Sequence, residues 1–359
     1  MPLTLYKAFM LEMGLRILAF GAGVFLVITT VLAAIRSFVL PRNESVLLSN
    51  WVFSGLRRAF TAIAKLGRTY SQRDKVMALY APVGLVALPI VWLGVVSLGY
   101  TIIFWALDEG SLERCYRLSN SSLLTLGSEE PTEGFTASFM SYSEATLGLF
   151  LMTLLISYLP TIYQAFSRRE LVVARLELRA GTEASAVELL CWLNRSGSLQ
   201  DDREQWEIWE EWFVEIEETH TSLPVLSFFR SPQPGRSWVM AAAIILDAAA
   251  LLISAVEMSH APNITLCFKA GCVAINRVSR FFKFEAQTKA PTPVDGKEPL
   301  EDPERQDFED ACEQLSKAGI PLKADVEGAW EQYQQLRIKY AGAVDYLAKL
   351  TMAPVTKPI

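Results

Sequence analysis

The sequence predicts an all-α membrane protein with three transmembrane helices, followed by a cytosolic α-helical domain. Hydrophobic residues make up 51% of the 359 residues while 20% are charged, an average typical of a membrane part joined to a water-exposed part. The long apolar runs lie mostly before Arg168, and most acidic residues lie after it. No stretch alternates apolar and polar residues as half-buried strands do.

Charge and cysteine content exclude some classes of protein. The net charge of -6 argues against a nucleic-acid-binding surface. The five cysteines are scattered and odd in number, which indicates reduced thiols in a cytosolic environment rather than a disulfide framework.

Six segments follow from the distribution of apolar, basic and proline-rich stretches. We predict an N-terminal transmembrane helix in residues 1–40, a basic cytoplasmic linker with an amphipathic helix in 41–75, and a pore domain in 76–170. A cytosolic helical domain in 171–285, a linker in 286–302 and a C-terminal helical hairpin in 303–359 complete the chain.

The first apolar segment is Ile17–Ile35, with Arg16 and Arg36 at its two ends. At about 1.5 Å per residue it just spans a hydrocarbon core of about 30 Å. A cleaved signal peptide is the alternative, but no small-x-small cleavage site follows the segment where processing requires one. A retained transmembrane helix is therefore the prediction.

The linker that follows is strongly basic. Within it, the stretch Trp51–Leu66 places apolar residues three or four apart, which predicts a helix with one apolar face beside a basic face. Two interpretations remain open: a helix lying on an anionic membrane leaflet, or an amphipathic helix packed against the chain's own domain.

Two further apolar segments are long enough to cross a bilayer. The second is Val76–Leu107 with Pro82 and Pro89 inside it, where prolines tend to kink a membrane helix. The third is Phe135–Phe166.

Basic residues set the orientation. They dominate the 41–75 linker and the segment that opens with Arg168 and Arg169, whereas the connection between the second and third segments is acidic. By the positive-inside rule, the linker and the C-terminal domain are expected in the cytoplasm. The acidic connection and the N-terminus are then external, in a multi-pass protein of the cell membrane.

The acidic connection has the layout of a re-entrant loop. Ser111–Leu124 has the length of a short helix, and Thr125-Leu126-Gly127 follows it. We expect these three residues to return as an extended strand whose carbonyls face an axis, because irregular backbone at membrane depth survives only where it lines a water-filled cavity. A plain extracellular loop that happens to contain this tripeptide is the alternative.

The segment SNSSLLTLGSEEP resembles the pore signature of potassium channels, S-x-S-T-x-T-x-G-Y-G-D-x-x-P. Together with SYLPTIYQAFSRRE, Leu118–Gly127 resembles a group of bacterial proteins labelled two-pore-domain or ion-channel family proteins, over roughly residues 76–260. The resemblance implies two helices and a pore loop, assembly as a homotetramer in membrane lipid, conduction of monovalent cations such as potassium and sodium, and a cytosolic helical appendage.

The filter letters depart from that signature after the glycine. Thr125, Leu126 and Gly127 match T-x-G, but Ser128 replaces the aromatic residue and Glu129 replaces the second glycine, followed by Glu130. A non-glycine residue at a site of positive φ costs about 1 kcal/mol or more. Strict potassium selectivity is therefore not expected, and rings of Glu129 and Glu130 at the pore mouth would concentrate cations. A solvated acidic loop is the alternative role for these two residues.

The third segment carries three candidate residues. Glu144 is either a pore-facing or interior-paired acid, or a side chain that reaches water at the interface. Gly148 allows close packing or a bend. Pro160 is either the hinge of a gate or a helix-end proline at the interface.

The chain after the third apolar segment is predicted to be helical. We expect an extension of the third segment to Gly181 and an acidic helix that ends at about Thr219. Further helices are expected at Glu183–Asn194, Pro303–Lys317 and Val326–Leu350. The acidic helix carries Trp206, Trp209 and Trp212 on one face, which is typical of core or interface packing.

Trp238–Val256 is long enough to span a membrane, but Asp247 lies at its centre and basic residues flank both ends. A charged side chain there costs about 2.5–3.5 kcal/mol on insertion scales. We predict a buried cytosolic helix whose Asp247 finds a basic or hydroxyl partner; a fourth membrane span is the alternative.

No cofactor, metal or enzyme activity is predicted. Cys267 and Cys272 do not have zinc-ribbon spacing, and the chain contains only two histidines, so structural cysteines are expected. Nucleotide-binding, hydrolase and metalloprotease motifs are missing. Two hypotheses remain: a tetrameric, weakly selective cation channel gated by or coupled to its cytosolic domain, and a non-conducting membrane-anchored scaffold or sensor that keeps a degenerate loop.

Overall fold

The computed structural model describes residues 3–38, 47–67, 69–181, 184–199, 203–233, 235–258, 262–282 and 303–353. Within these ranges the chain is helical, and its one β contact is an isolated antiparallel bridge between Val256 and Leu322. The predicted linker at 286–302 lies outside the described residues. The chain divides into two compact units, Met1–Tyr163 and Gln164–Ile359.

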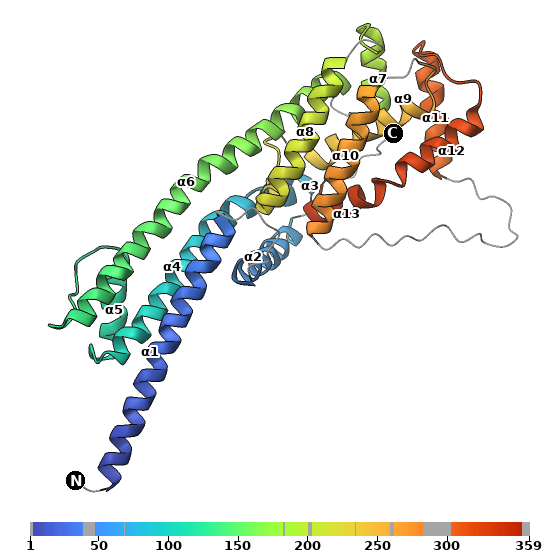
Figure 1. The fold of residues 1–359 in the computed structure, drawn as a ribbon. Helices are drawn as coiled ribbons and strands as arrows, with labels where there is room; N and C mark the ends of the chain where they lie inside the picture. The colour runs from blue at the N-terminus through green and yellow to red at the C-terminus, as the bar shows by residue number, and fades with distance from the viewer. Residues whose placement is uncertain are drawn as a thin grey trace, which may run out of the picture. The chain divides into compact units, whose positions relative to one another are not determined.

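Unit 1 contains the long apolar helices (Figure 1). In chain order its elements are α1 (Leu3–Phe38), α2 (Leu47–Lys65), α3 (Tyr70–Ala78), α4 (Tyr80–Ala106), α5 (Leu112–Leu123) and the first part of α6 (Phe135–Ala180).

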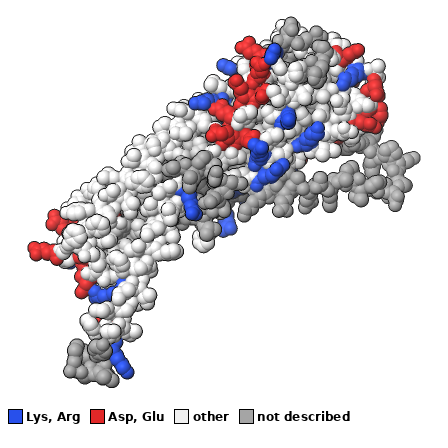
Figure 2. Space-filling view, viewed as in Figure 1, with Lys and Arg blue, Asp and Glu red and all other residues white. Residues whose placement is uncertain are grey.

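Three helical stretches in the described residues are long and apolar enough to cross a membrane: Phe9–Ser37, Gln72–Ala106 and Phe135–Ala180. Many of their large apolar side chains are exposed, among them Phe25, Ile90 and Ile156. Figure 2 shows few charged side chains along these helices and a cluster of acidic ones at the loop end of unit 1. The predicted helical class and its three helices of sufficient length and apolarity to cross a membrane are therefore confirmed.

The second apolar segment differs from its prediction at its start. It is not one helix from Val76, because α3 ends at Ala78 and α4 begins at Tyr80, with Leu79 between them. Pro82 consequently lies in the first turn of α4, where backbone N–H groups have no intrahelical acceptor and a missing one costs little. Pro89 lies inside the helix, as predicted.

Helices α1 and α4 pack closely through two glycines. A Cβ added to Gly23 would lie 2.7 Å from the carbonyl oxygen of Gly99, and one added to Gly99 would lie 2.7 Å from Val27. Small residues that let backbones approach are typical of helix pairs in membranes. At one end of this pair Arg16 of α1 forms an ion pair with Asp108, at 2.9 Å.

The predicted amphipathic helix is observed as α2. It packs on α4, where Phe53 approaches Gly84 and accepts a hydrogen bond at its carbonyl from the Tyr80 hydroxyl. Trp51 and Ile63 are exposed. Contact with an anionic leaflet stays a prediction.

Unit 2 is a helical domain around one apolar core. Its elements are the end of α6, α7 (Ala186–Arg195), α8 (Arg203–Ser222), the 3-10 helix η1 (Pro224–Phe228), α9 (Trp238–Ser254), α10 (Pro262–Phe281), α11 (Pro303–Lys317), α12 (Val326–Arg337) and α13 (Ala341–Thr351). The extension of the third apolar segment is confirmed, because α6 runs to Ala180 and ends at Gly181, whose φ is +78°.

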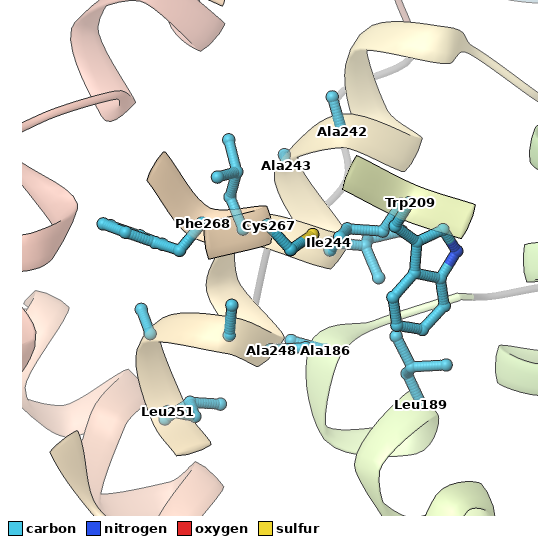
Figure 3. Close-up of a cluster of buried hydrophobic side chains, with 14 of the residues drawn as sticks. Ala186, Leu189, Trp209, Ala242, Ala243, Ile244, Ala248, Leu251, Cys267 and Phe268 are labelled. Carbon is cyan, nitrogen blue, oxygen red and sulfur yellow. The ribbon is translucent and has the colours of Figure 1, made fainter. Parts of the chain in front are cut away.

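Helix α9 is the centre of that core. Nearly all of its residues are buried among α7, α10, α12 and α13, and Figure 3 shows Ile244, Ala248 and Leu251 of α9 beside Cys267 and Phe268 of α10. The predicted buried helix is therefore confirmed. Trp206, Trp209 and Trp212 of α8 are also buried in the core, which confirms their predicted packing role.

The predicted helix Val326–Leu350 is wrong in one respect, because it is interrupted at residues 338–340. Tyr340 has φ −136° and is the N-cap residue that precedes α13. Its buried hydroxyl donates a hydrogen bond to Asp247, and Arg337 lies 4.0 Å from the same carboxylate. The break brings both side chains to α9, and the expected basic or hydroxyl partner of Asp247 is thus confirmed.

Candidate functional site

The candidate site in unit 1 is built on α5, the short helix between two long apolar ones. Ser111 caps its first turn by accepting a hydrogen bond from the backbone N–H of Arg114 at 3.3 Å. One face of α5, including Cys115, Leu118 and Leu123, is buried against α4 and neighbouring side chains of α6. The predicted short helix is confirmed.

A buried polar cluster joins α4, α5 and α6. The hydroxyl oxygen of Ser119 on α5 lies 3.0 Å from the carbonyl oxygen of Ser97 and 2.5 Å from Oε1 of Glu144. Glu144 is 0% exposed, so the alternative in which it reaches water at the interface is wrong, and interior pairing is what the fold shows. Its second oxygen, Oε2, has no hydrogen-bond partner among the described residues.

Further hydroxyl pairs extend this cluster. The Ser122 and Ser141 hydroxyls lie 2.8 Å apart between α5 and α6, and the Tyr100 hydroxyl lies 2.8 Å from that of Ser143 between α4 and α6. In an apolar surrounding such bonds hold helices in register, because a polar group left without a partner is costly. The hydroxyls therefore fix the position of α5 between its neighbours.

Gly148 lets α6 approach the end of α5. A Cβ at this position would lie only 2.0 Å from the carbonyl oxygen of Leu123. Of the two roles predicted for Gly148, close packing is confirmed.

The loop after α5 differs from the predicted extended strand. Thr125 has φ +53°, and its N–H donates to the carbonyl of Ser122 while the N–H of Leu126 donates to that of Ser121. This pattern is a Schellman motif, with Thr125 at the left-handed position that glycine normally occupies. The predicted extended conformation is wrong for Thr125, because carbonyl groups at the end of α5 accept hydrogen bonds from the N–H groups of Thr125 and Leu126. Gly127 has a left-handed φ of +65°, as predicted, and Leu126 is 65% exposed.

Glu129 is tied back to α5. Its N–H donates to the Ser121 hydroxyl at 2.9 Å, that hydroxyl lies 3.1 Å from the Glu129 carbonyl oxygen, and its carboxylate forms an ion pair with Arg117 at 3.2 Å. Ser128 and Glu130 are exposed. Contacts with Ser121 and Arg117 therefore hold the loop against α5 at Glu129.

The far side of the loop is held by Glu109. Its carboxylate is 2% exposed and accepts two hydrogen bonds from Thr132, from the N–H at 2.7 Å and from the hydroxyl at 2.6 Å. In the sequence, Glu109 stands out only as one of several acids in this connection. Buried pairings between distant residues leave no local pattern, and the same holds for Ser97 and Ser119.

Pro160 lies inside α6, which continues to Ala180. The helix-end alternative for Pro160 is therefore wrong, and the hinge stays a prediction. No group of three or more His, Cys, Asp or Glu side chains suited to a metal ion occurs in the described part of the chain.

Comparison with protein-family models, with curated proteins and with solved structures found no match to this chain. The site therefore has to be interpreted from its own geometry.

Proposed function

We propose that the chain is a potassium-channel-like cation channel, assembled as a homotetramer, weakly selective, and coupled to its C-terminal helical unit. The observation that carries the proposal is the placement of α5. A short helix lies between two long apolar helices, and its end is seated on Gly148 directly before the Thr125-Leu126-Gly127 loop.

The electrostatics of this arrangement favour cations. The C-terminal end of a helix carries a partial negative charge, so a cation is stabilised near it. The end of α5 leads into a loop with Glu129 and Glu130, and Glu113 and Glu133 lie nearby in the sequence. A cation approaching this loop meets negative charge from both sources.

Weak selectivity follows from the residues after Gly127. Ser128 and Glu129 provide neither the aromatic ring nor the second glycine of a strict potassium filter. A carboxylate ring attracts cations by charge and discriminates poorly among those of equal charge.

Single-channel recording in planar bilayers with asymmetric potassium and sodium tests the proposal. We expect a conductance with a cation reversal potential, and Glu129→Gln should lower the conductance and shift the selectivity. Glu133→Gln, an identical change at an exposed acid of the same loop, should have a smaller effect. Equal effects of the two variants would contradict a role for residues 125–129 in the ion path.

The second candidate is a non-conducting membrane-anchored scaffold or sensor. The contacts of Glu129 with Ser121 and Arg117 favour it, because they use the loop's groups within the chain. If the scaffold interpretation holds, cation flux stays at background in correctly assembled protein. Arg117→Gln frees the Glu129 carboxylate from its ion pair, and the cation flux of this variant should also stay at background.

A further inference from the structure

A hollow in unit 2 lies at the N-terminal end of α9. Its walls come from η1, from the residues just before α9, and from the C-terminal end of α13, and it is open to solvent on one side. Ser227, Ser231, Arg230, Arg236, Trp238 and Thr351 are among the residues that line it.

Three hydrogen-bond donors around this hollow have no acceptor among the described residues. They are the hydroxyl of Ser227, the hydroxyl of Ser231 and Nε of Arg236. Ser227 is 1% exposed, so water cannot freely satisfy its hydroxyl. Buried polar groups are nearly always bonded, and three unbonded donors around one space indicate a missing acceptor.

The charge of the hollow is positive. Two guanidinium groups line it: Arg230 donates to the carbonyl oxygens of Thr351 and Met352, and Arg236 forms an ion pair with Glu177 of α6. The positive end of the α9 dipole adds to them. The side chain of Ser237 caps α9 by accepting a hydrogen bond from the N–H of Val239, so the hydroxyls of Ser227 and Ser231 are not the N-cap acceptor.

We propose that this hollow binds a phosphate group, either of a small soluble ligand or of a lipid headgroup. A phosphate offers at least three acceptor oxygens in a tetrahedral arrangement, so it can accept from three donors on different residues that line one hollow. A carboxylate has only two oxygens, which lie in one plane, and carries less negative charge, so it matches this donor set less well. The two arginines and the end of α9 compensate the ligand's charge.

The walls of the hollow are bonded to the cytosolic end of α6. Arg169 donates hydrogen bonds to the carbonyl oxygens of Leu226 at 2.8 Å and Phe229 at 2.7 Å, and Glu177 pairs with Arg236. A phosphate that recruits Arg236 competes with Glu177 and so acts on α6 directly. That consequence for gating rests on the proposed channel function, whereas phosphate binding itself does not.

Binding of inorganic phosphate to the purified full-length chain tests the proposal, measured by calorimetry and by the melting temperature in phosphate-free detergent buffer. We expect phosphate to raise the melting temperature, and Ser227→Ala and Arg236→Gln each to weaken binding at least tenfold. Arg277→Gln is the matched control, because Arg277 also pairs with a glutamate, Glu217, but outside the hollow. Its phosphate affinity should equal that of the wild type.

Ser227→Ala separates a ligand role from a structural one. Without phosphate its melting temperature should equal or exceed that of the wild type, because the variant loses a buried hydroxyl that bonds nothing. Absence of any effect of phosphate on the wild type, or undiminished binding by both variants, would overturn the proposal. Neither readout requires ion flux, so failure here is distinguishable from failure of the channel proposal.

The source of the phosphate is resolved by repeating the titration in nanodiscs. If a headgroup occupies the hollow, discs containing phosphatidylglycerol weaken inorganic phosphate binding relative to phosphatidylcholine discs. If the ligand is soluble, the two lipid compositions give the same affinity. Equal phosphate binding by wild type and Ser227→Ala in both kinds of disc would again contradict the site.

Discussion

Gly148 sets how closely two helices approach. The carbonyl oxygen of Leu123 occupies the place where a Cβ would be, so only glycine fits without moving α5 or α6. The other contacts in this region, such as the bond between Ser119 and Glu144, depend on the same separation.

Gly148→Ala should therefore destabilise unit 1. Forcing one methyl group into a filled space costs about 1–3 kcal/mol, and the clashing atom belongs to backbone that cannot rotate away. Gly94→Ala is the control, since no atom lies within 4 Å of its added Cβ, and alanine should stabilise α4 there by about 1 kcal/mol. Melting temperatures in one detergent compare the two; a stable Gly148→Ala variant would contradict the observed packing.

Asp247 is the buried acid at the centre of unit 2. Burial raises the pKa of Asp247 to about 6, while the charge of Arg337 and the Tyr340 hydroxyl oppose the shift. The folded chain therefore binds this proton more tightly than an unfolded chain, whose aspartate pKa is about 3.9.

The sign of the pH dependence follows from that difference. Between about pH 4 and pH 6 the unfolded state has lost the proton and the folded state retains it, so the free energy of unfolding falls as pH rises, by about 3 kcal/mol in total. Asp247→Asn should remove this slope, whereas Asp345→Asn, on an exposed position of α13, should keep it. Unfolding measured across this pH range compares the variants, and an unchanged slope in Asp247→Asn would refute the assignment.

At the scale of elements, the end of α5 carries an unusual residue. Thr125 adopts the left-handed conformation of the Schellman motif, and this costs a β-branched residue about 1 kcal/mol or more relative to glycine. A strained residue retained in a loop is a reason to suspect a role for its side chain.

Thr125→Gly should stabilise the fold by about 1 kcal/mol and, if the Thr125 hydroxyl takes part in the ion path, reduce conductance. For stability, Ser128→Gly is the control in the same loop, because the φ of Ser128 is not positive and glycine there only adds flexibility to the unfolded chain. Thermal unfolding and bilayer recording are made on the same preparations. A destabilised Thr125→Gly variant would argue against the left-handed geometry.

Local periodicity predicted most helices of this chain. The spacing of apolar residues indicated α2, α8 and α11, because each is an amphipathic helix. The length of Ser111–Leu124 between two apolar segments indicated α5. The break at 338–340 was not predictable, since Tyr340 leaves the helix to bond with Asp247, which is 93 residues away in the sequence.

The candidate site likewise has features that the sequence predicts and features that it does not. The position of α5 and the left-handed Gly127 followed from residue type and order. The pairing of Glu144 with Ser119 and the clamp of Glu109 on Thr132 depend on how separate helices align, which no short pattern encodes. The conformation of Thr125 was missed because a threonine seldom ends a helix in this way.

At the scale of the whole molecule, α6 leaves a long apolar face without cover within unit 1. Leu149, Met152, Ile156 and Leu159 are exposed at spacings of three and four, so they share one face. Only 17% of the apolar part of α6 is buried within the chain. In a membrane, lipid or further copies of the chain would cover this face, and a tetrameric pore requires copies.

Cysteine cross-linking distinguishes these two possibilities. Ile156→Cys, treated with a short bis-maleimide in membranes, should give species of up to four chains, because inner helices of a pore meet around its axis. Ile90→Cys on α4 is the control: it is similarly exposed but is expected to face lipid. The wild type reports any background from the native cysteines. If Ile156→Cys stays monomeric while the protein is folded, lipid covers α6, the tetrameric channel is excluded and the scaffold interpretation holds.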